Sequence, residues 1–171
     1  RRKLGLITDK RIFGTIARLS PEKNLSYIVE MAKAMPEDLF VIAGDGPLRK
    51  SLEKEKPNNL HILGFIKDVE TVYNALDGFI LPSKIEGTPI SILEAMASGV
   101  SVYASNVGAI GDIISSEHSG YFLTMDLDAD IELVNKTYEE ESIRENALTY
   151  IEERHDIQNN AKDFFCLFLS D

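Results

Sequence analysis

Residues 79–99 read FILPSKIEGTPISILEAMASG, and this stretch decides the fold that we expect for the chain. It opens with an apolar run, Phe79 to Leu81, that is short enough for a buried strand. A Gly-Thr-Pro turn follows, and the next apolar residues have the spacing of a helix that stops at Gly99. The stretch therefore predicts a strand, a turn and a helix in succession.

The start of this helix predicts a place for an anion. Thr88 can cap the helix, and Pro89 suits its first position, where a missing N–H costs nothing. The N–H groups of Ile90, Ser91 and Ile92 then have no partner inside the helix, so they carry the positive end of its dipole. Backbone amides in this arrangement commonly bind phosphate.

Two carboxylates flank this turn. Glu86 lies just after the strand, and Glu94 follows eight positions later on the helix. A carboxylate next to a phosphate site repels the bound phosphate, so we expect the acid to bind another part of the ligand. A nucleotide sugar removes the conflict, because the acids accept hydrogen bonds from sugar hydroxyls while the amides bind the phosphates.

The rest of the chain alternates between strand and helix. We expect strands at 11–17, 39–43, 60–63, 79–81, 100–103 and 120–122, with helices between them that include 22–35 and 69–76. Apolar strands that alternate with helices indicate a parallel sheet covered on both faces. We therefore predict one doubly wound, Rossmann-like α/β domain, followed beyond residue 126 by extra C-terminal helices, the last near 158–169.

Length and charge limit the class of protein. A chain of 171 residues is enough for one domain with a proper core and short for two. The net charge of -10 argues against nucleic acid or an anionic membrane as a direct partner of this segment. The single Cys166 excludes an intrachain disulfide framework, as expected of a reducing compartment such as the cytoplasm. No apolar segment approaches the roughly 20 residues that span a bilayer.

Ligands of an open parallel sheet gather at the carboxyl ends of its strands, so the turns there hold candidate binding residues. After the first strand, Arg18 and Lys23 lie five positions apart across a turn, where both cations can face one anion. A guanidinium offers a planar fork and an ammonium a mobile point charge, which together suit a diphosphate.

Three further turns are less specific. Gly44 and Gly46 follow the second strand and fit a sharp turn as well as a ligand close to the backbone. Phe65 and Ile66 follow the third strand. This segment is interpreted equally well as a buried glycine turn or as a loop that binds the ligand. The glycine turn at 107–114 leads into a helix and carries no residue that we assign to the site.

The sequence Glu86-Gly87 followed by Glu94-Ala95-Met96-Ala97-Ser98-Gly99 resembles the Glu-x7-Glu signature of retaining glycosyltransferases of family 4, also called glycosyltransferase group 1, which have the two-domain GT-B fold. The similarity covers roughly residues 10–123. It implies that residues 1–171 are the carboxyl-terminal, donor-binding domain of such an enzyme. The amino-terminal domain that binds the acceptor is then absent, so the isolated chain is expected to be nearly inactive.

The resemblance also implies roles for individual residues. Arg18 and Lys23 match an Arg-x4-Lys pair that binds the donor diphosphate and stabilises the leaving group, although Asn24 stands where the family usually has Gly. Glu86 is implied to hold a sugar hydroxyl and face the positive charge that grows on the ring, and Glu94 to accept the ribose hydroxyls. The other implied donor-binding residues are Gly87, Thr88, Pro89, Ile90, Ser91, Gly44, Gly46, Phe65 and Ile66.

The implied reaction is the transfer of a hexosyl-type sugar, with retention, from a nucleoside-diphosphate sugar to a hydroxyl of a glycan, lipid or other saccharide. No metal or other cofactor is implied, and the three histidines lack the paired spacing of metal ligands. We expect the enzyme in the cytoplasm, with peripheral association of the full-length protein at the inner face of the membrane left open. Two alternatives also stay open: a non-catalytic nucleotide-binding α/β module, and a GT-B sugar-nucleotide epimerase.

Overall fold

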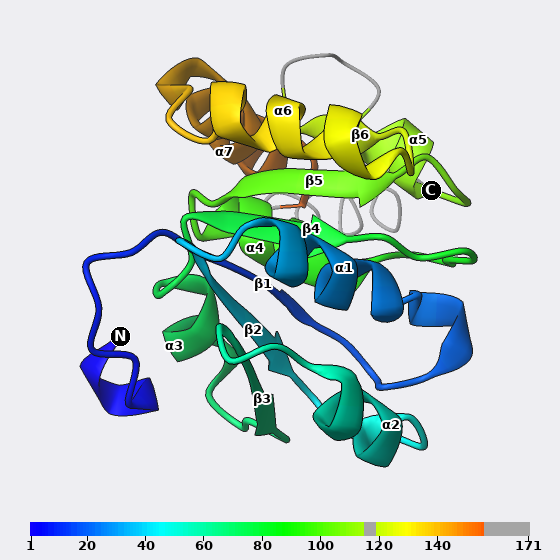
Figure 1. Cartoon of the computed structure of the whole chain (residues 1–171). Coiled ribbons are helices and arrows are strands. Elements are labelled where there is room, and N and C mark those ends of the chain that lie inside the picture. Colours follow the sequence, from blue (N-terminus) through cyan, green and yellow to red (C-terminus); the bar gives the residue numbers. More distant parts are fainter. Residues whose placement is uncertain (115–118, 156–171) are drawn as a thin grey trace, which may run out of the picture.

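The computed structural model describes residues 1–114 and 119–155, which contain a six-stranded sheet (Figure 1). The order across the sheet is β3-β2-β1-β4-β5-β6, and every neighbouring pair is parallel. This arrangement confirms the predicted doubly wound, Rossmann-like α/β fold. The strands are β1 (Ile12–Ile16), β2 (Leu39–Ala43), β3 (Leu60–Gly64), β4 (Gly78–Leu81), β5 (Ser101–Ser105) and β6 (Tyr121–Leu123).

Helices cover both faces of the sheet, and Figure 1 shows α1 in front of it and α4 behind it. One face is covered by α1 (Ser26–Ala34), α2 (Arg49–Glu55) and α6 (Leu127–Thr137). The other is covered by α3 (Val69–Tyr73), α4 (Ile90–Ala97), α5 (Ile110–Ile114) and α7 (Glu141–His155). Two short 3-10 helices, η1 (Arg2–Leu4) and η2 (Pro21–Lys23), complete the described elements.

The alternation of side chains along each strand builds the two-sided core. In β4, Ile80 belongs to the apolar cluster under α1, whereas Phe79 and Leu81 belong to the cluster under α4. All three are fully buried. Because successive strand residues point to opposite faces, a strand covered on both sides needs an apolar residue at every position, which is why these runs are continuous.

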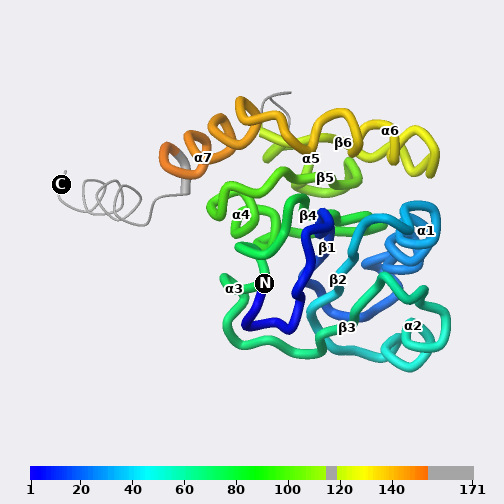
Figure 2. Tube along the Cα trace, turned by 60° about the vertical axis from the view of Figure 1, so that its left-hand side comes forward, coloured from blue at the N-terminus to red at the C-terminus, as the bar shows by residue number. Residues whose placement is uncertain are grey.

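The N-terminal segment and the last described helix extend the face that carries α4. Figure 2 shows the N-terminal segment close to α3, and α7 next to α4. Leu6 and Ala147 are buried in the same apolar cluster as Met96 of α4. The cluster therefore ties both ends of the described chain to the α4 side of the sheet.

Two predicted elements differ from the structure. The helix expected at 22–35 is divided into η2 and α1, because Asn24 adopts a left-handed conformation with φ of 50° between them. Asparagine tolerates this conformation better than most residues, which explains how it stands where the resembling family has Gly. The cap predicted at Thr88 is wrong: α4 begins at Ile90 after Pro89, and no side chain caps it. The helix predicted near 158–169 lies outside the described residues.

The end of α4 agrees with the sequence. Gly99 is left-handed with φ of 69°, and its N–H donates to the carbonyl of Met96. The N–H of Val100 donates to the carbonyl of Ala95 in the same turn. This pair of hydrogen bonds is the usual glycine-dependent helix stop, and it leads directly into β5.

Candidate functional site

The strand order reverses between β1 and β4, so the loops that follow these neighbours leave toward opposite faces of the sheet. A crevice opens between such loops, and ligands of doubly wound folds bind there. We call the loops 17–25, 44–48, 64–68, 82–89 and 106–109 the carboxyl end of the sheet.

An ion pair links the two central loops at the carboxyl end. Lys23 Nζ donates to Glu86 Oε1 at 2.7 Å, and the two side chains are only 21% and 7% exposed. The backbone adds a second link, from the Lys84 N–H to the carbonyl of Glu22 at 2.8 Å. The cation predicted after β1 and the acid predicted after β4 therefore meet in one site.

Glu86 has a second donor on the same oxygen. Ser83 Oγ donates to Glu86 Oε1 at 2.6 Å, and Ser83 is 2% exposed. Ser105 of β5 in turn donates to the carbonyl of Ser83. Both contacts use Oε1, so the other oxygen of Glu86 accepts no hydrogen bond from the described residues.

Gly108 supports the Glu86 loop from the other side. Its φ is 55°, and a Cβ at this position would lie 2.0 Å from the carbonyl oxygen of Glu86. Only glycine allows the two loops to approach so closely. The turn at 107–114, which the sequence left without a site residue, therefore shapes the site through its backbone.

The amides at the start of α4 are less available than the sequence predicts. The Ile90 N–H donates to the carbonyl of Thr88 and the Ile92 N–H to the carbonyl of Pro89, both at 3.0 Å. Both acceptors precede α4, so these N–H groups lack a partner inside the helix as predicted, but they are not free, because the chain turns tightly at Pro89. Within the described part of the chain, no protein group accepts from the N–H of Ser91, nor from those of Gly87 and Thr88 in the loop before it.

Glu94 is held by a tyrosine that the sequence did not single out. Tyr73 Oη donates to Glu94 Oε2 at 2.8 Å and lies 3.1 Å from the carbonyl oxygen of Ser91. Burial above all, then the hydrogen bond and charge of Glu94, raises the pKa of Tyr73, so its hydroxyl stays a donor. Tyr73 lies at a core position of the helix expected at 69–76, so its residue type alone gives no signal of this contact.

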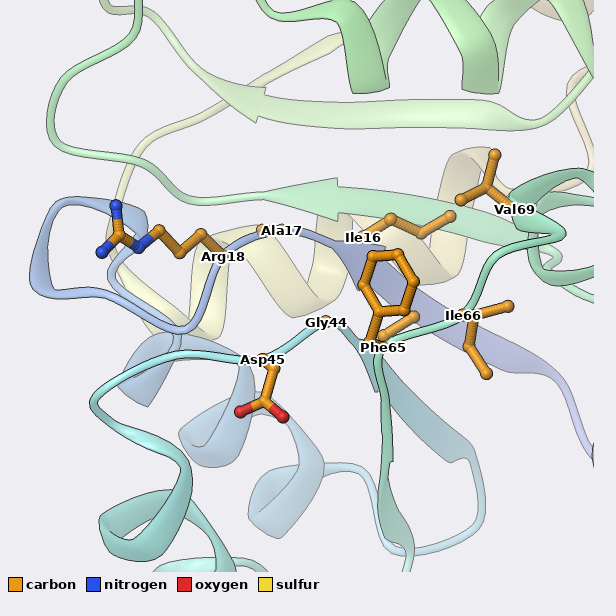
Figure 3. A pocket seen from close by; sticks show the side chains of 9 residues that line it. Ile16, Ala17, Arg18, Gly44, Asp45, Phe65, Ile66 and Val69 are labelled. Atoms are coloured by element: carbon orange, nitrogen blue, oxygen red, sulfur yellow. The ribbon is translucent and has the colours of Figure 1, made fainter.

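A pocket of about 360 Å³ opens beside this site (Figure 3). Arg18 lies at one end of it, and Ile66 and Val69 lie at the other. The guanidinium of Arg18 makes no hydrogen bond with the described residues, and Phe65 is 79% exposed although it is aromatic. The lining residues are Ile16, Ala17, Arg18, Ala43, Gly44, Asp45, Phe65, Ile66 and Val69.

The two glycines after β2 let their loop touch the loop after β1. A Cβ at Gly44 would lie 1.9 Å from the carbonyl oxygen of Ala17, and one at Gly46 would lie 2.6 Å from that of Leu19. Both glycines therefore have a structural role. Gly44 also lines the pocket, whereas Gly46 does not. The two glycines, for which the sequence predicts the same possible roles, therefore differ in their position relative to the pocket.

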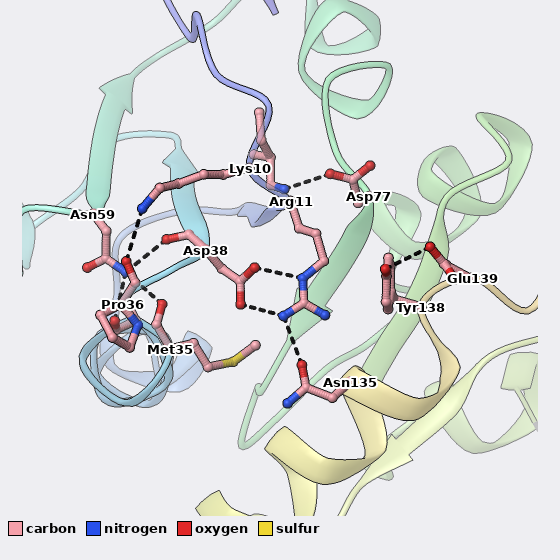
Figure 4. Close-up of polar contacts among 12 residues, drawn as sticks. Lys10, Arg11, Met35, Pro36, Asp38, Asn59, Asp77, Asn135, Tyr138 and Glu139 are labelled. Carbon is pink, nitrogen blue, oxygen red and sulfur yellow. Dashed lines mark hydrogen bonds and ion pairs between the residues drawn. The ribbon is translucent and has the colours of Figure 1, made fainter.

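Another partly buried ion pair lies at the opposite end of the sheet. We call residues 9–11, 35–38, 56–59 and 74–77 the amino end of the sheet. Arg11 donates to both carboxylate oxygens of Asp38, at 2.7 and 2.6 Å, and to Asn135 at 2.8 Å (Figure 4). Its guanidinium also lies 4.7 Å from the centre of the Tyr138 ring. The hydrogen bonds to Asp38 raise the pKa of Arg11.

Residues 1–114 and 119–155 contain neither a metal-binding cluster nor a membrane-spanning helix. No group of three His, Cys, Asp or Glu side chains in these ranges is arranged to hold a metal ion. No helix in the same ranges has both the length and the apolar character needed to cross a membrane.

The whole of the site lies within a match to a known family model, which covers residues 1–164 and is described as glycosyl transferases group 1. The chain belongs to this family. It is 32% identical over 139 residues to the Escherichia coli UDP-Gal:alpha-D-GlcNAc-diphosphoundecaprenol alpha-1,3-galactosyltransferase, which is 74% of this chain and 36% of that enzyme. It is 34% identical over 132 residues to the alpha-monoglucosyldiacylglycerol synthase of Streptococcus pneumoniae, covering 70% of this chain and 30% of that enzyme. The match thus spans about a third of the length of these relatives.

Solved structures share the fold. Anabaena HepE in complex with UDP and glucose matches with a TM-score of 0.86 and 22% identity, over 100% of this chain and 51% of that one. The C-terminal domain of a glycosyl transferase group 1 family protein, LpcC of Francisella tularensis, matches with a TM-score of 0.72 and 22% identity. That match covers 86% of this chain and 87% of the other.

Proposed function

We propose that this chain binds a nucleoside-diphosphate sugar at the carboxyl end of the sheet and is the donor-binding half of a retaining, hexosyl-type glycosyltransferase. The proposal rests above all on the Lys23–Glu86 ion pair, which brings the cation of one motif to the acid of the other. The E. coli relative named for UDP-Gal, and the neighbour solved with UDP and glucose, support this class of donor.

The ion pair answers the electrostatic problem posed by an acid beside a phosphate. Lys23 offsets the charge of Glu86, so a diphosphate meets less repulsion there. An ammonium carries three N–H donors, and Glu86 takes one, so Lys23 keeps donors for a phosphate oxygen. Arg18 and the amides of Gly87, Thr88 and Ser91 add further donors.

Catalysis follows from the same charges. When the bond between the anomeric carbon and the diphosphate breaks, negative charge develops on the leaving phosphate oxygen. Lys23, Arg18 and the loop amides stabilise that charge, and donors fixed in advance usually give the largest catalytic term. The oxygen of Glu86 that has no donor among the described residues accepts a hydrogen bond from a sugar hydroxyl and faces the positive charge on the ring. Glu94 accepts the ribose hydroxyls.

The acceptor belongs to a part of the enzyme beyond this chain. The relatives are about three times as long as the matched segment, and the Francisella structure described as a C-terminal domain matches over nearly its whole length. We therefore assign the acceptor, a saccharide or lipid, to an amino-terminal domain that closes over the donor. One relative is named for a diphosphoundecaprenol-linked sugar and another for a glucosylated diacylglycerol, so a lipid acceptor and a peripheral membrane location of the full-length enzyme are part of the proposal.

Titration calorimetry tests donor binding by the chain. UDP, GDP and ADP and their glucose conjugates are added to the parent chain and to Arg18→Ala and Glu94→Ala. We expect at least one nucleotide to bind, and both variants to bind it about tenfold or more weakly, because each loses a charged hydrogen bond. Glu140→Ala is the matched control, since Glu140 also accepts from a tyrosine, Tyr121, on β6. Absence of binding, or unchanged affinity in both variants, contradicts the proposal.

The reaction itself is tested on the full-length protein. Incubation with the sugar nucleotide that binds best, with and without a saccharide or lipid acceptor, separates transfer from epimerisation of the donor. We expect a glycosylated product that keeps the anomeric configuration of the donor. An epimerised sugar nucleotide with no transfer product contradicts the proposal and favours the epimerase alternative.

A further inference from the structure

We propose that Tyr73 is a positioning residue for Glu94: its hydroxyl holds one carboxylate oxygen so that the other is set to accept the ribose hydroxyls of the donor. The inference rests on the proposed function, because it concerns the residue assigned there to the ribose. It adds a residue from α3, which lies outside the loops of the carboxyl end.

The contact of Tyr73 uses only part of the Glu94 carboxylate. The hydroxyl donates to Oε2 at 2.8 Å, and Oε1 accepts no hydrogen bond from the described residues. The carbonyl of Ser91 is a second acceptor at 3.1 Å, but a tyrosine hydroxyl has a single proton. The carboxylate is both closer and charged, so it is the stronger acceptor. Oε1 is thus the oxygen available to a ligand.

The ring of Tyr73 is fixed by packing. The side chain is 1% exposed, and its ring lies 5.7 Å from the ring of Phe79 in β4. It belongs to the apolar cluster that also contains Ala95 and Met96 of α4. A ring held by a strand and a helix cannot follow a moving glutamate, so the hydroxyl selects one orientation of Glu94.

This arrangement predicts an effect that depends on the ligand. A glutamate fixed in advance loses less side-chain freedom when it binds a ribose, so affinity improves only for ligands that carry the hydroxyls. Tyr73→Phe keeps the ring and removes only the donor. It should weaken binding of a ribonucleotide about fivefold to tenfold and leave binding of the 2′,3′-dideoxy analogue unchanged.

The experiment is titration calorimetry of the chain with UDP, GDP and ADP and with their 2′,3′-dideoxy counterparts. Tyr27→Phe is the matched control, because Tyr27 is also buried and donates to a carboxylate, that of Asp130, on the other face of the sheet. Thermal unfolding of both variants shows that each is folded. Tyr73→Phe in a Glu94→Ala background completes a double-mutant cycle, in which the tyrosine change should have no further effect.

The outcomes separate the two proposals. Loss of the preference for ribose in Tyr73→Phe, with the preference intact in Tyr27→Phe, supports the positioning role. If the parent prefers the ribonucleotide and Tyr73→Phe keeps the whole preference, the positioning role is overturned while the proposed function stands. If the parent binds none of the three nucleotides, the proposed function fails and this inference fails with it.

Discussion

One ion pair at the amino end of the sheet and one at the carboxyl end differ in how fully the carboxylate is used. At the amino end, Arg11 and Asp38 share two hydrogen bonds, and both oxygens of the carboxylate are occupied. At the carboxyl end, Lys23 and Ser83 share one oxygen of Glu86 and leave the other without a donor from the described residues. The Arg11–Asp38 pair is saturated and stabilises the fold, whereas the Lys23–Glu86 pair leaves one carboxylate oxygen that we propose binds the donor sugar.

The difference follows from the topology of a parallel sheet. The carboxyl end is where strands lead into helix starts, whose exposed N–H groups attract anions. The amino end receives chains that leave helices, so its polar groups are needed to close the turns. Asp77 is an example, since its carboxylate accepts the Ile12 N–H at 2.7 Å and pairs with Arg1.

The largest expected effect comes from removing the charge of Glu86. Glu86→Gln keeps the shape of the side chain but removes its negative charge. The variant therefore neither offsets the charge of Lys23 nor stabilises the positive charge that develops on the sugar ring. We expect the transfer rate of the full-length enzyme to fall about 100-fold or more, as when a preorganised catalytic group is lost. A steady-state assay of transfer measures it. Glu22→Gln, a substitution of an exposed glutamate in the facing loop, is the control, and equal rates in the two variants contradict the assignment.

The second prediction concerns the amino end. Arg11→Met removes the partner of Asp38, which is 5% exposed, and leaves its carboxylate without the two charged hydrogen bonds. The free energy of unfolding should fall by about 2–3 kcal/mol, which denaturant titration measures. Nucleotide affinity of the folded variant should not change. If Arg11→Met weakens nucleotide binding and leaves the free energy of unfolding unchanged, the stabilising role that we give to the amino end is wrong.

Much of this comparison could be predicted from the sequence. The continuous apolar strands, the turn residues and the stop at Gly99 are local signals, and they placed Arg18, Lys23 and Glu86 at strand ends correctly. The pairing of Lys23 with Glu86 joins residues 63 positions apart, so it depends on which strands become neighbours. No local pattern specifies that β1 and β4 are adjacent.

The missed features have a common cause. Tyr73 has the spacing of a core residue, and only the packing of α3 against α4 brings its hydroxyl to Glu94. Gly108 has no side chain, which allows the carbonyl of Glu86 to lie close to its backbone. The cap at Thr88 failed because the carbonyl of that residue, instead of its side chain, accepts the Ile90 N–H. These are properties of tertiary contacts and of one tight turn, and residue types alone do not encode them.

The third prediction separates backbone conformation from loop contact. Gly108 and Gly99 are both left-handed, but a Cβ would meet the Glu86 carbonyl at Gly108 and nothing within 4 Å at Gly99. Gly99→Ala should cost about 1–2 kcal/mol in unfolding free energy, from conformation alone. Gly108→Ala should cost more and also weaken nucleotide binding, because the Glu86 loop must move. Equal costs and unchanged affinity in both variants would show that the loop contact is unimportant.

The smallest effect is expected from Ser83→Ala. The variant removes one of the two donors to Glu86 and leaves Lys23 in place. We expect the transfer rate of the full-length enzyme to fall about fivefold, which corresponds to roughly 1 kcal/mol for one hydrogen bond. Ser51→Ala is the control, since Ser51 donates to Glu55 on the surface of α2. A rate as high as that of the parent enzyme would show that Lys23 alone orients Glu86.

The most direct measurement of the central claim is an NMR titration of the ¹⁵N-labelled chain with UDP, GDP and ADP. Binding at the carboxyl end predicts that amide shift changes concentrate in residues 17–24, 44–46, 64–66 and 86–91. The amides of Arg11, Asp38 and Asp77 at the amino end should stay unchanged. Shift changes centred on the amino end, or none with any of the three nucleotides, would contradict the account.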